Sequence, residues 1–211
     1  MMAPGPVNGG RRANMVHRQH PANGEAGRPM KIVVTGPFSA GKTTLIRTIA
    51  DVAIVGTERE VTDETRATKT TTTVAMDFGR INFADGLSLY VFGTPGQRRF
   101  ETVWEILSEG MLGFIVLVHA GDEASMNDAA HILSSFRSYA DVPFVIGVTH
   151  LDQTEQEPHL LFTQLSIGLE LPPEAPVVAC DPRSKEDVKA LLLHILFGVK
   201  SRLNRAGSRG A

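Results

Sequence analysis

The segment Gly36–Thr43, which reads GPFSAGKT, constrains the fold of this chain more than any other stretch. An apolar run precedes it at residues 32–35, and a helical pattern begins at Lys42. Between a strand and a helix, a G-x-x-x-x-G-K-T sequence forms a loop whose backbone N–H groups bind phosphate, and the helix dipole adds positive potential. The segment therefore predicts a binding site for a nucleoside triphosphate or its product.

The residue types within this segment suit separate tasks. We expect Lys42 to reach the β- and γ-phosphates, where it would neutralise charge during catalysis, and the Thr43 hydroxyl to bind Mg²⁺. The other expected phosphate contacts come from the loop and the start of the helix, namely Gly36, Ser39, Ala40, Gly41 and Thr44.

Length and charge exclude several classes of protein. The chain has 211 residues, enough for one α/β core, and its net charge of −2 is too small for a nucleic-acid-binding surface. Its single cysteine cannot form an internal disulfide, which suits a reducing cytosol. We expect neither a signal peptide nor a lipid attachment, and the apolar runs are far shorter than the roughly 18 residues of a membrane span. The sequence predicts a cytoplasmic protein without a direct membrane anchor, brought to a membrane only by a partner.

Three segments of the chain differ in composition. Residues 1–29 are rich in Gly, Pro, Arg and Asn, which predicts a disordered N-terminal tail. Residues 30–200 carry the periodic apolar patterns of one folded domain. Residues 201–211 are polar and predict a flexible C-terminal tail.

The order of strand and helix patterns predicts an α/β fold. After a helix from Lys42 to about Ala53, residues 56–72 are polar and threonine-rich, which predicts a long functional or mobile loop. Alternating runs at 73–78 and 87–92 flank an Asp-Gly turn and predict an antiparallel hairpin. The remaining strands and helices alternate, which gives a six-stranded, mostly parallel sheet with one antiparallel edge strand and helices on both faces. Those strands are expected at 114–118, 144–148 and 176–179, and the helices at 100–107, 126–139, 158–169 and from Ser184 to about Val199, with Ser125–Asp128 and Ser184–Asp187 as capping boxes.

The later motifs follow this framework in a recognisable order. Taken with the phosphate-binding loop, they resemble the guanine-nucleotide motifs of Ras-like small GTPases over residues 31–199. Within that superfamily the chain looks most like the bacterial branch, the actinobacterial conservon GTPases related to the gliding-motility polarity GTPase. The residues that carry the resemblance are Thr73 at a strand start, Thr94–Gln97 (TPGQ) at a strand end, Thr149–Asp152 (THLD), and the stretch 177–183 (VVACDPR).

The resemblance implies roles for residues near the γ-phosphate. Thr73 matches the threonine that contacts Mg²⁺ and the γ-phosphate, although the threonines at 70–72 leave this register open by one. Gly96 matches the glycine whose N–H senses the γ-phosphate, and Gln97 the glutamine that orients the attacking water. The alternatives are a β-favouring threonine run and an exposed surface glutamine.

The resemblance also implies a guanine site in the last two motifs. The Asp152 carboxylate would accept hydrogen bonds from N1–H and the N2 amine of guanine, a donor pair that adenine lacks. Thr149 and His150 belong to the same motif, and backbone N–H groups near Ala179 and Cys180 would meet the guanine O6. The alternative for Asp152 is an ordinary helix N-cap.

Three departures from the family pattern predict slow intrinsic hydrolysis. Gly93 stands where most of the superfamily has an aspartate that holds Mg²⁺ through water, and the gliding-motility branch shares this departure. His150 replaces a lysine that packs over the base, which predicts weaker base binding. Phe38 replaces a glycine, and its side chain would crowd Gln97 and any arginine supplied by a partner.

Residues beside the TPGQ segment each have two interpretations. Arg66, Arg98 and Arg99 are candidates for stabilising transition-state charge, or they are solvated loop arginines. Trp104 lies on a helical stripe with Phe100, which predicts core packing or, as a second interpretation, a partner-binding hot spot.

The sequence thus predicts a small GTPase that binds GTP and GDP with Mg²⁺ and acts as a nucleotide-dependent switch. By resemblance, its partners would be a roadblock-type regulator and a sensor kinase system. One alternative is a pseudo-GTPase that holds nucleotide with little hydrolysis. The other is a P-loop ATPase or kinase that uses the same phosphate-binding loop.

Overall fold

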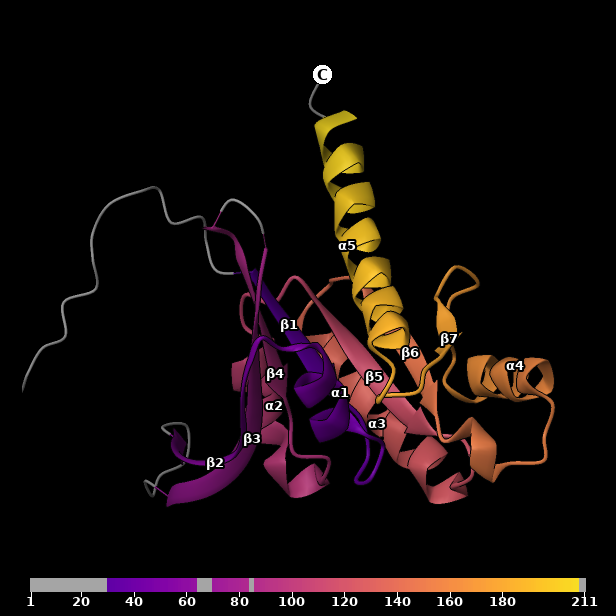
Figure 1. Cartoon of the computed structure of the whole chain (residues 1–211), viewed down its shortest axis with the longest axis horizontal. Coiled ribbons are helices and arrows are strands. Elements are labelled where there is room, and N and C mark those ends of the chain that lie inside the picture. Colours follow the sequence, from indigo (N-terminus) through magenta and orange to yellow (C-terminus); the bar gives the residue numbers. More distant parts are fainter. Residues whose placement is uncertain (1–29, 64–69, 84–85, 209–211) are drawn as a thin grey trace, which may run out of the picture.

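The computed structural model describes residues 30–63, 70–83 and 86–208 (Figure 1). The predicted N-terminal tail, residues 1–29, and the candidate Arg66 lie outside the described residues.

The described part of the chain forms a seven-stranded sheet in the order β2-β3-β4-β1-β5-β6-β7. Strands β4, β1, β5, β6 and β7 are parallel to their neighbours in this series, whereas β3 pairs antiparallel with both β2 and β4. The mixed α/β fold of the prediction is confirmed. The strands are β1 (Met30–Thr35), β2 (Val52–Asp63), β3 (Thr70–Asn82), β4 (Ser88–Gly93), β5 (Gly113–His119), β6 (Phe144–Thr149) and β7 (Val177–Ala179).

The predicted number of strands and the predicted edge were wrong. Residues 52–63 form β2, so the described sheet has seven strands rather than six, and the antiparallel strand β3 lies one place inside the edge. The first helix ends at Ile49, because Ala50 already has an extended backbone. An edge strand is held by backbone pairing on one side and does not need an apolar pattern. The start of β2 continues the predicted helical stretch to about Ala53, and its polar part from Gly56 onward has the composition of a loop.

Helices cover both faces of the sheet, and the alternation along β1 shows which core each face forms. Ile32 and Val34 pack with residues of α1 and α5, whereas Val33 packs with residues of α2, α3 and α4. Figure 1 shows α1 and α5 together in front of the sheet. The helices are α1 (Lys42–Ile49), η2 (Arg98–Phe100), α2 (Glu101–Ser108), α3 (Glu123–Tyr139), η3 (Leu151–Gln153), α4 (Pro158–Gly168) and α5 (Lys185–Ser208).

One of the two predicted capping boxes is confirmed in its serine half only, because the Asp187 carboxylate accepts from the Asp181 N–H and the Ser184 hydroxyl and not from the Ser184 N–H. Ser184 precedes α5 and its hydroxyl accepts a hydrogen bond from the Asp187 N–H at 3.2 Å. The other prediction was wrong, since α3 begins earlier and Asp122 caps it by accepting from the Ala124 N–H. The Ser125 hydroxyl instead accepts from the His119 N–H at the end of β5.

Helix α5 extends beyond the length that the sequence indicated. It continues to Ser208, and its residues from Ser201 onward are exposed. In the described ranges, no helix has both the length and the apolar character needed to cross a bilayer.

Two leucines on α5 test where the core ends. Leu191 is fully buried and Leu193 is 48% exposed. We expect Leu191→Ala to lower the free energy of unfolding by about 2–5 kcal/mol, because the core would keep a cavity. Leu193→Ala should cost about 0.5 kcal/mol or less. Urea denaturation of both variants measures the difference, and equal losses would contradict this arrangement of the core.

Candidate functional site

The loop between β1 and α1 approaches β5 so closely that only glycine fits at its start. A Cβ on Gly36 would lie 2.3 Å from the Leu117 carbonyl oxygen, and Gly36 has a φ of +136°. Gly41 caps α1 with a φ of +94°. Both glycines of the motif are therefore required by geometry, and the predicted strand–loop–helix arrangement is confirmed.

Lys42 lies across the loop that precedes it. Its Nζ donates to the carbonyl oxygens of Gly36 and Pro37, at 2.8 and 2.5 Å. Burial lowers the pKa of the Lys42 ammonium to about 8, against the raising effect of the Asp77 carboxylate. A partly buried cation that donates to neutral carbonyl groups gains when a phosphate anion replaces those contacts.

Thr43 meets a carboxylate that the sequence analysis did not select. The Thr43 hydroxyl donates to Asp77 Oδ2 at 2.5 Å, and the Gly56 N–H donates to Asp77 Oδ1 at 3.0 Å. A hydroxyl and a carboxylate oxygen side by side are hard ligands of the kind that Mg²⁺ prefers. Thr43 and Asp77 are thus the residues that fit a magnesium ion.

Asp77 takes the place of the side chain that Gly93 lacks. The two residues face each other in the β3–β4 register. A Cβ on Gly93 would lie 2.8 Å from Ile46 Cδ1, the end of a flexible side chain, and 3.0 Å from Asp77 Cβ, so a side chain at position 93 requires both neighbours to shift. The only sequence signal for Asp77 was a carboxylate inside an otherwise apolar alternation, opposite a glycine.

The structure places the residues predicted near the γ-phosphate at different distances from the loop. Gly96 touches it, because a Cβ there would lie 2.7 Å from Gly36 O and from Phe38 N. Gln97 follows Gly96 and is exposed. Thr73 lies on β3 four residues before Asp77, which is about 13 Å along an extended strand, so it is not next to Thr43 here.

The two described arginine candidates beside Gln97 already have neighbours. Arg98 forms an ion pair with Asp128 of α3 at 3.1 Å, and both side chains are largely exposed. Arg99 stacks over the Phe100 ring at 4.8 Å. Phe38 is 75% exposed, so its side chain is not part of the core.

The Thr149 hydroxyl links the phosphate-binding loop to the second predicted site. Buried Thr149 Oγ1 lies 3.2 Å from Ala40 O and 3.1 Å from Val118 O. The next residue, His150, has a left-handed backbone, and its ring stacks on His119 with centroids 3.9 Å apart and 7° between the planes. The pKa of His150 is lowered, first by partial burial and then by the neighbouring His119. The Asp152 carboxylate acts in the opposite direction and raises the pKa of His150.

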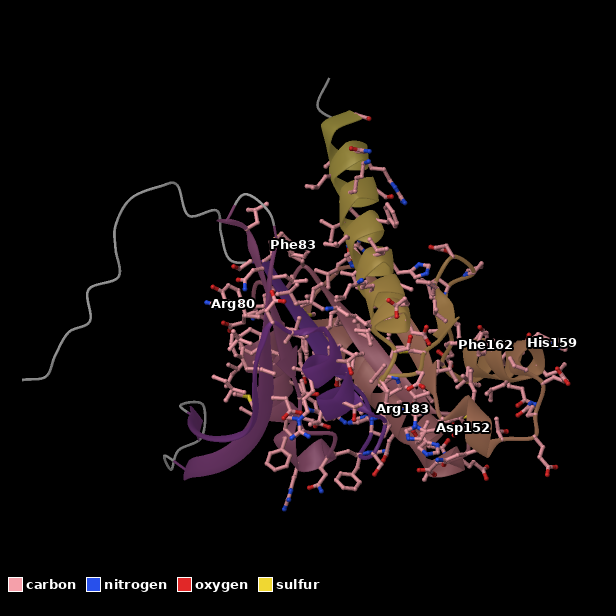
Figure 2. All side chains as sticks on the ribbon, viewed as in Figure 1. Arg80, Phe83, Asp152, His159, Phe162 and Arg183 are labelled. Carbon is pink, nitrogen blue, oxygen red and sulfur yellow. The ribbon has the colours of Figure 1, made fainter. Side chains whose placement is uncertain are left out.

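A cleft of about 520 Å³ runs from the phosphate-binding loop to the predicted base site. Asp152 and Arg183 both line it (Figure 2). A second hollow of about 540 Å³ holds Thr43 and Asp77. The two hollows share Ser39, Gly41 and Thr44 in their linings, so they adjoin at the phosphate-binding loop.

The last predicted motif lies at the far wall of this cleft. Ala179 is exposed at the end of β7, and Cys180 is buried. Burial raises the pKa of the Cys180 thiol to about 12, with further contributions from Asp187 and Asp181, so the thiol is not a nucleophile at neutral pH. The Cys180 N–H donates to Val148 O at 2.9 Å, a bond that competes with the predicted contact to guanine O6.

The fold and the loop define a nucleotide-binding protein of the P-loop class. Residues 50–195 match the family model described as conserved hypothetical ATP binding protein, and the chain belongs to this family. The matched range begins after the phosphate-binding loop and contains Asp77, Asp152 and Cys180.

Curated relatives share parts of the chain at low identity. Translation initiation factor IF-2 of Acidobacterium capsulatum is 26% identical over 157 residues, which is 72% of this chain and 14% of that protein. The same factor from Chlorobium luteolum is 27% identical over 140 residues, again 14% of its length. Uncharacterized protein MJ1339 of Methanocaldococcus jannaschii is 30% identical over 99 residues, 47% of this chain and 56% of that protein. The chain therefore spans about half or less of each relative.

The stacked histidines predict a loss of stability in acid. Because the pKa of His150 is lowered in the fold from its usual value near 6.5, the unfolded chain binds the proton more readily, so stability is lost as the pH falls below about 6.5. We expect His150→Gln to reduce the fall in melting temperature between pH 7.5 and 5.5. The exposed His159, changed to Gln, serves as the control. An unchanged pH profile for His150→Gln would contradict the effect.

Proposed function

We propose that this protein is a small GTPase of the bacterial Ras-like branch, acting as a nucleotide-dependent switch that binds GTP and GDP with Mg²⁺. The observation that carries the proposal is the continuous site between the phosphate-binding loop and the THLD motif, joined by the Thr149 hydroxyl. A nucleotide whose phosphates lie on the loop would extend along this cleft, and its base would meet Asp152.

Guanine recognition rests on Asp152 and its surroundings. The Asp152 carboxylate is exposed on η3 and lines the cleft, so it is available to accept from N1–H and the N2 amine of a guanine. The His150 ring is braced by His119 and offers a flat surface for stacking, in place of the lysine of the family pattern. An adenine would leave the Asp152 carboxylate without these donors.

The magnesium ion that we propose would be held by Thr43 and Asp77, and it would supply charge neutralisation at the β- and γ-phosphates. Thr73 joins this site only if the first part of β3 moves toward the loop when nucleotide binds. Because Asp77 provides the carboxylate that Gly93 cannot, the glycine at position 93 is not an argument for a pseudo-GTPase.

Slow hydrolysis is the expected chemistry. Gly96 touches the loop, and Gln97 follows it at the surface, where it would orient the attacking water. The exposed Phe38 lies on the loop beside Gly96 and would hinder the approach of an arginine from a partner. Lys42 would neutralise the charge that develops on the phosphates.

The partners and location follow from the resemblance and belong to the proposal. They are a roadblock-type regulator and a sensor kinase system, with the protein in the cytoplasm and at a membrane only through a partner.

An adenine nucleotide is the second candidate ligand, because the family description names ATP. It would use the same loop, Thr43 and Asp77, and would differ only at the base end of the cleft.

A competition experiment separates the two bases. Nucleotide-free protein is titrated with fluorescent GDP in the presence of Mg²⁺ and competed with GTP, ATP or XTP. We expect GTP to compete best, and Asp152→Asn to weaken GTP by about tenfold or more while favouring XTP, because the amide cannot accept both donors. Equal or stronger competition by ATP would overturn the guanine assignment and support the adenine candidate.

The same assay tests Asp77 through its dependence on magnesium. We expect Asp77→Asn to raise the Mg²⁺ concentration for half-maximal triphosphate binding by about tenfold, because a neutral amide holds the cation and the Thr43 hydroxyl less well. Asp152→Asn is the matched control, since it should alter base preference without altering the magnesium dependence. If Asp77→Asn titrates like the wild type, Asp77 does not serve the metal site.

A further inference from the structure

Trp104 connects the core to the TPGQ segment. The side chain lies on α2 and is fully buried, which confirms core packing over the partner-facing interpretation. Its one polar group, the indole N–H, donates to the Pro95 carbonyl oxygen at 2.8 Å. This bond crosses from the first turns of α2 back to the middle of the TPGQ segment.

Because the peptide bond is planar, the contact to the Pro95 carbonyl also determines the direction of the Gly96 N–H. The peptide between Pro95 and Gly96 is trans, like every peptide bond among the described residues. In a planar trans peptide the carbonyl and the following N–H point in opposite directions. Holding the Pro95 carbonyl toward Trp104 therefore directs the Gly96 N–H away from α2.

Gly96 lies against the phosphate-binding loop. A Cβ on Gly96 would be 2.7 Å from Gly36 O, Pro37 C and Phe38 N. At this distance from the loop, a small rotation of the Pro95–Gly96 peptide changes which groups its N–H can reach. The orientation of one peptide unit thus matters for contact with the last phosphate of a bound nucleotide.

The residue before this peptide unit and the indole that bonds its carbonyl are both held by further contacts. Before it, the Thr94 N–H donates to Val34 O at 3.0 Å, and the Thr94 hydroxyl donates to Thr35 Oγ1 at 2.8 Å. After it, the Trp104 ring lies 6.2 Å from both the His131 and Phe136 rings of α3, measured between centroids. The indole cannot turn without disturbing the packing of α2 on α3.

We propose that Trp104 is a positioning residue that aims the Gly96 N–H at the γ-phosphate and thereby sets the preference for triphosphate over diphosphate. The inference rests on the proposed nucleotide site but not on the identity of the base. A buried indole N–H needs an acceptor in any case, so a purely structural role would affect stability alone. The two roles differ in the ratio of triphosphate to diphosphate affinity.

Trp104→Phe removes the N–H and keeps an aromatic ring in the core. We measure dissociation constants for GDP and a non-hydrolysable GTP analogue, or for the adenine pair if the wild type prefers adenine. We expect the triphosphate-to-diphosphate preference to fall by about tenfold, because the Pro95 carbonyl loses the indole hydrogen bond that holds it toward α2. An unchanged preference in a folded Trp104→Phe variant overturns the proposal.

Phe136→Leu is the matched control, because it loosens the packing on the same indole and keeps the N–H. It should lower the melting temperature and leave the nucleotide preference unchanged, and an equal change in preference in this variant would overturn the proposal.

A wild-type measurement covers the case in which Trp104→Phe does not fold. Trp104 is the sole tryptophan, so its emission should change when the triphosphate analogue replaces the diphosphate, and a constant emission overturns the proposal. A wild type that binds neither purine pair overturns the proposed function as well, whereas binding with an unchanged preference overturns only the role of Trp104.

Discussion

The close approach of the phosphate-binding loop to β5 is the contact on which the rest of the site depends. The loop follows the carboxyl end of β1, and there Gly36 lies against the Leu117 carbonyl of β5 with no room for a side chain. There the loop opens into α1, whose N-terminus favours an anion. The Thr149 hydroxyl then fastens Ala40 of the loop to the end of β6, which leads directly to Asp152. The spacing between the phosphate-binding loop and Asp152 follows from these two contacts.

Asp77 on β3 and Gly93 on β4 face each other, and the carboxylate beside Thr43 comes from β3. Asp77 contacts the Thr43 hydroxyl from β3, and a side chain on Gly93 would crowd both Asp77 and Ile46. The glycine at position 93 thus accompanies a carboxylate on the neighbouring strand. Trp104 and Gly96 are related in a similar way, because the indole N–H on α2 holds the Pro95 carbonyl and thereby determines the direction of the Gly96 N–H.

The parallel part of the fold could be predicted because its strands are buried on both faces and read as continuous apolar runs. The edge could not, because β2 is held by backbone hydrogen bonds to β3, which require no alternation of apolar residues. Its first residues continue the helical pattern of α1, and the residues from Gly56 onward are mostly polar. The same Ser-x-x-Asp spacing occurs near the starts of α3 and α5, but only one of the two serines caps its helix. Ser184 caps α5 as expected, whereas the hydroxyl of Ser125 is bonded to the His119 N–H of β5, and Asp122 caps α3 instead.

The sequence by itself determined the phosphate-binding loop, the alternation of strands and helices, and the order of the motifs along the chain. These are local properties, carried by the spacing of neighbouring residues and by the conformations that glycine alone adopts. Only the tertiary structure decided that Asp77 would lie beside Thr43, that His150 would stack on His119, and that the Trp104 N–H would hold the Pro95 carbonyl. Each of these contacts depends on strand register or helix packing, which bring together residues whose separation in the sequence carries no periodic signal.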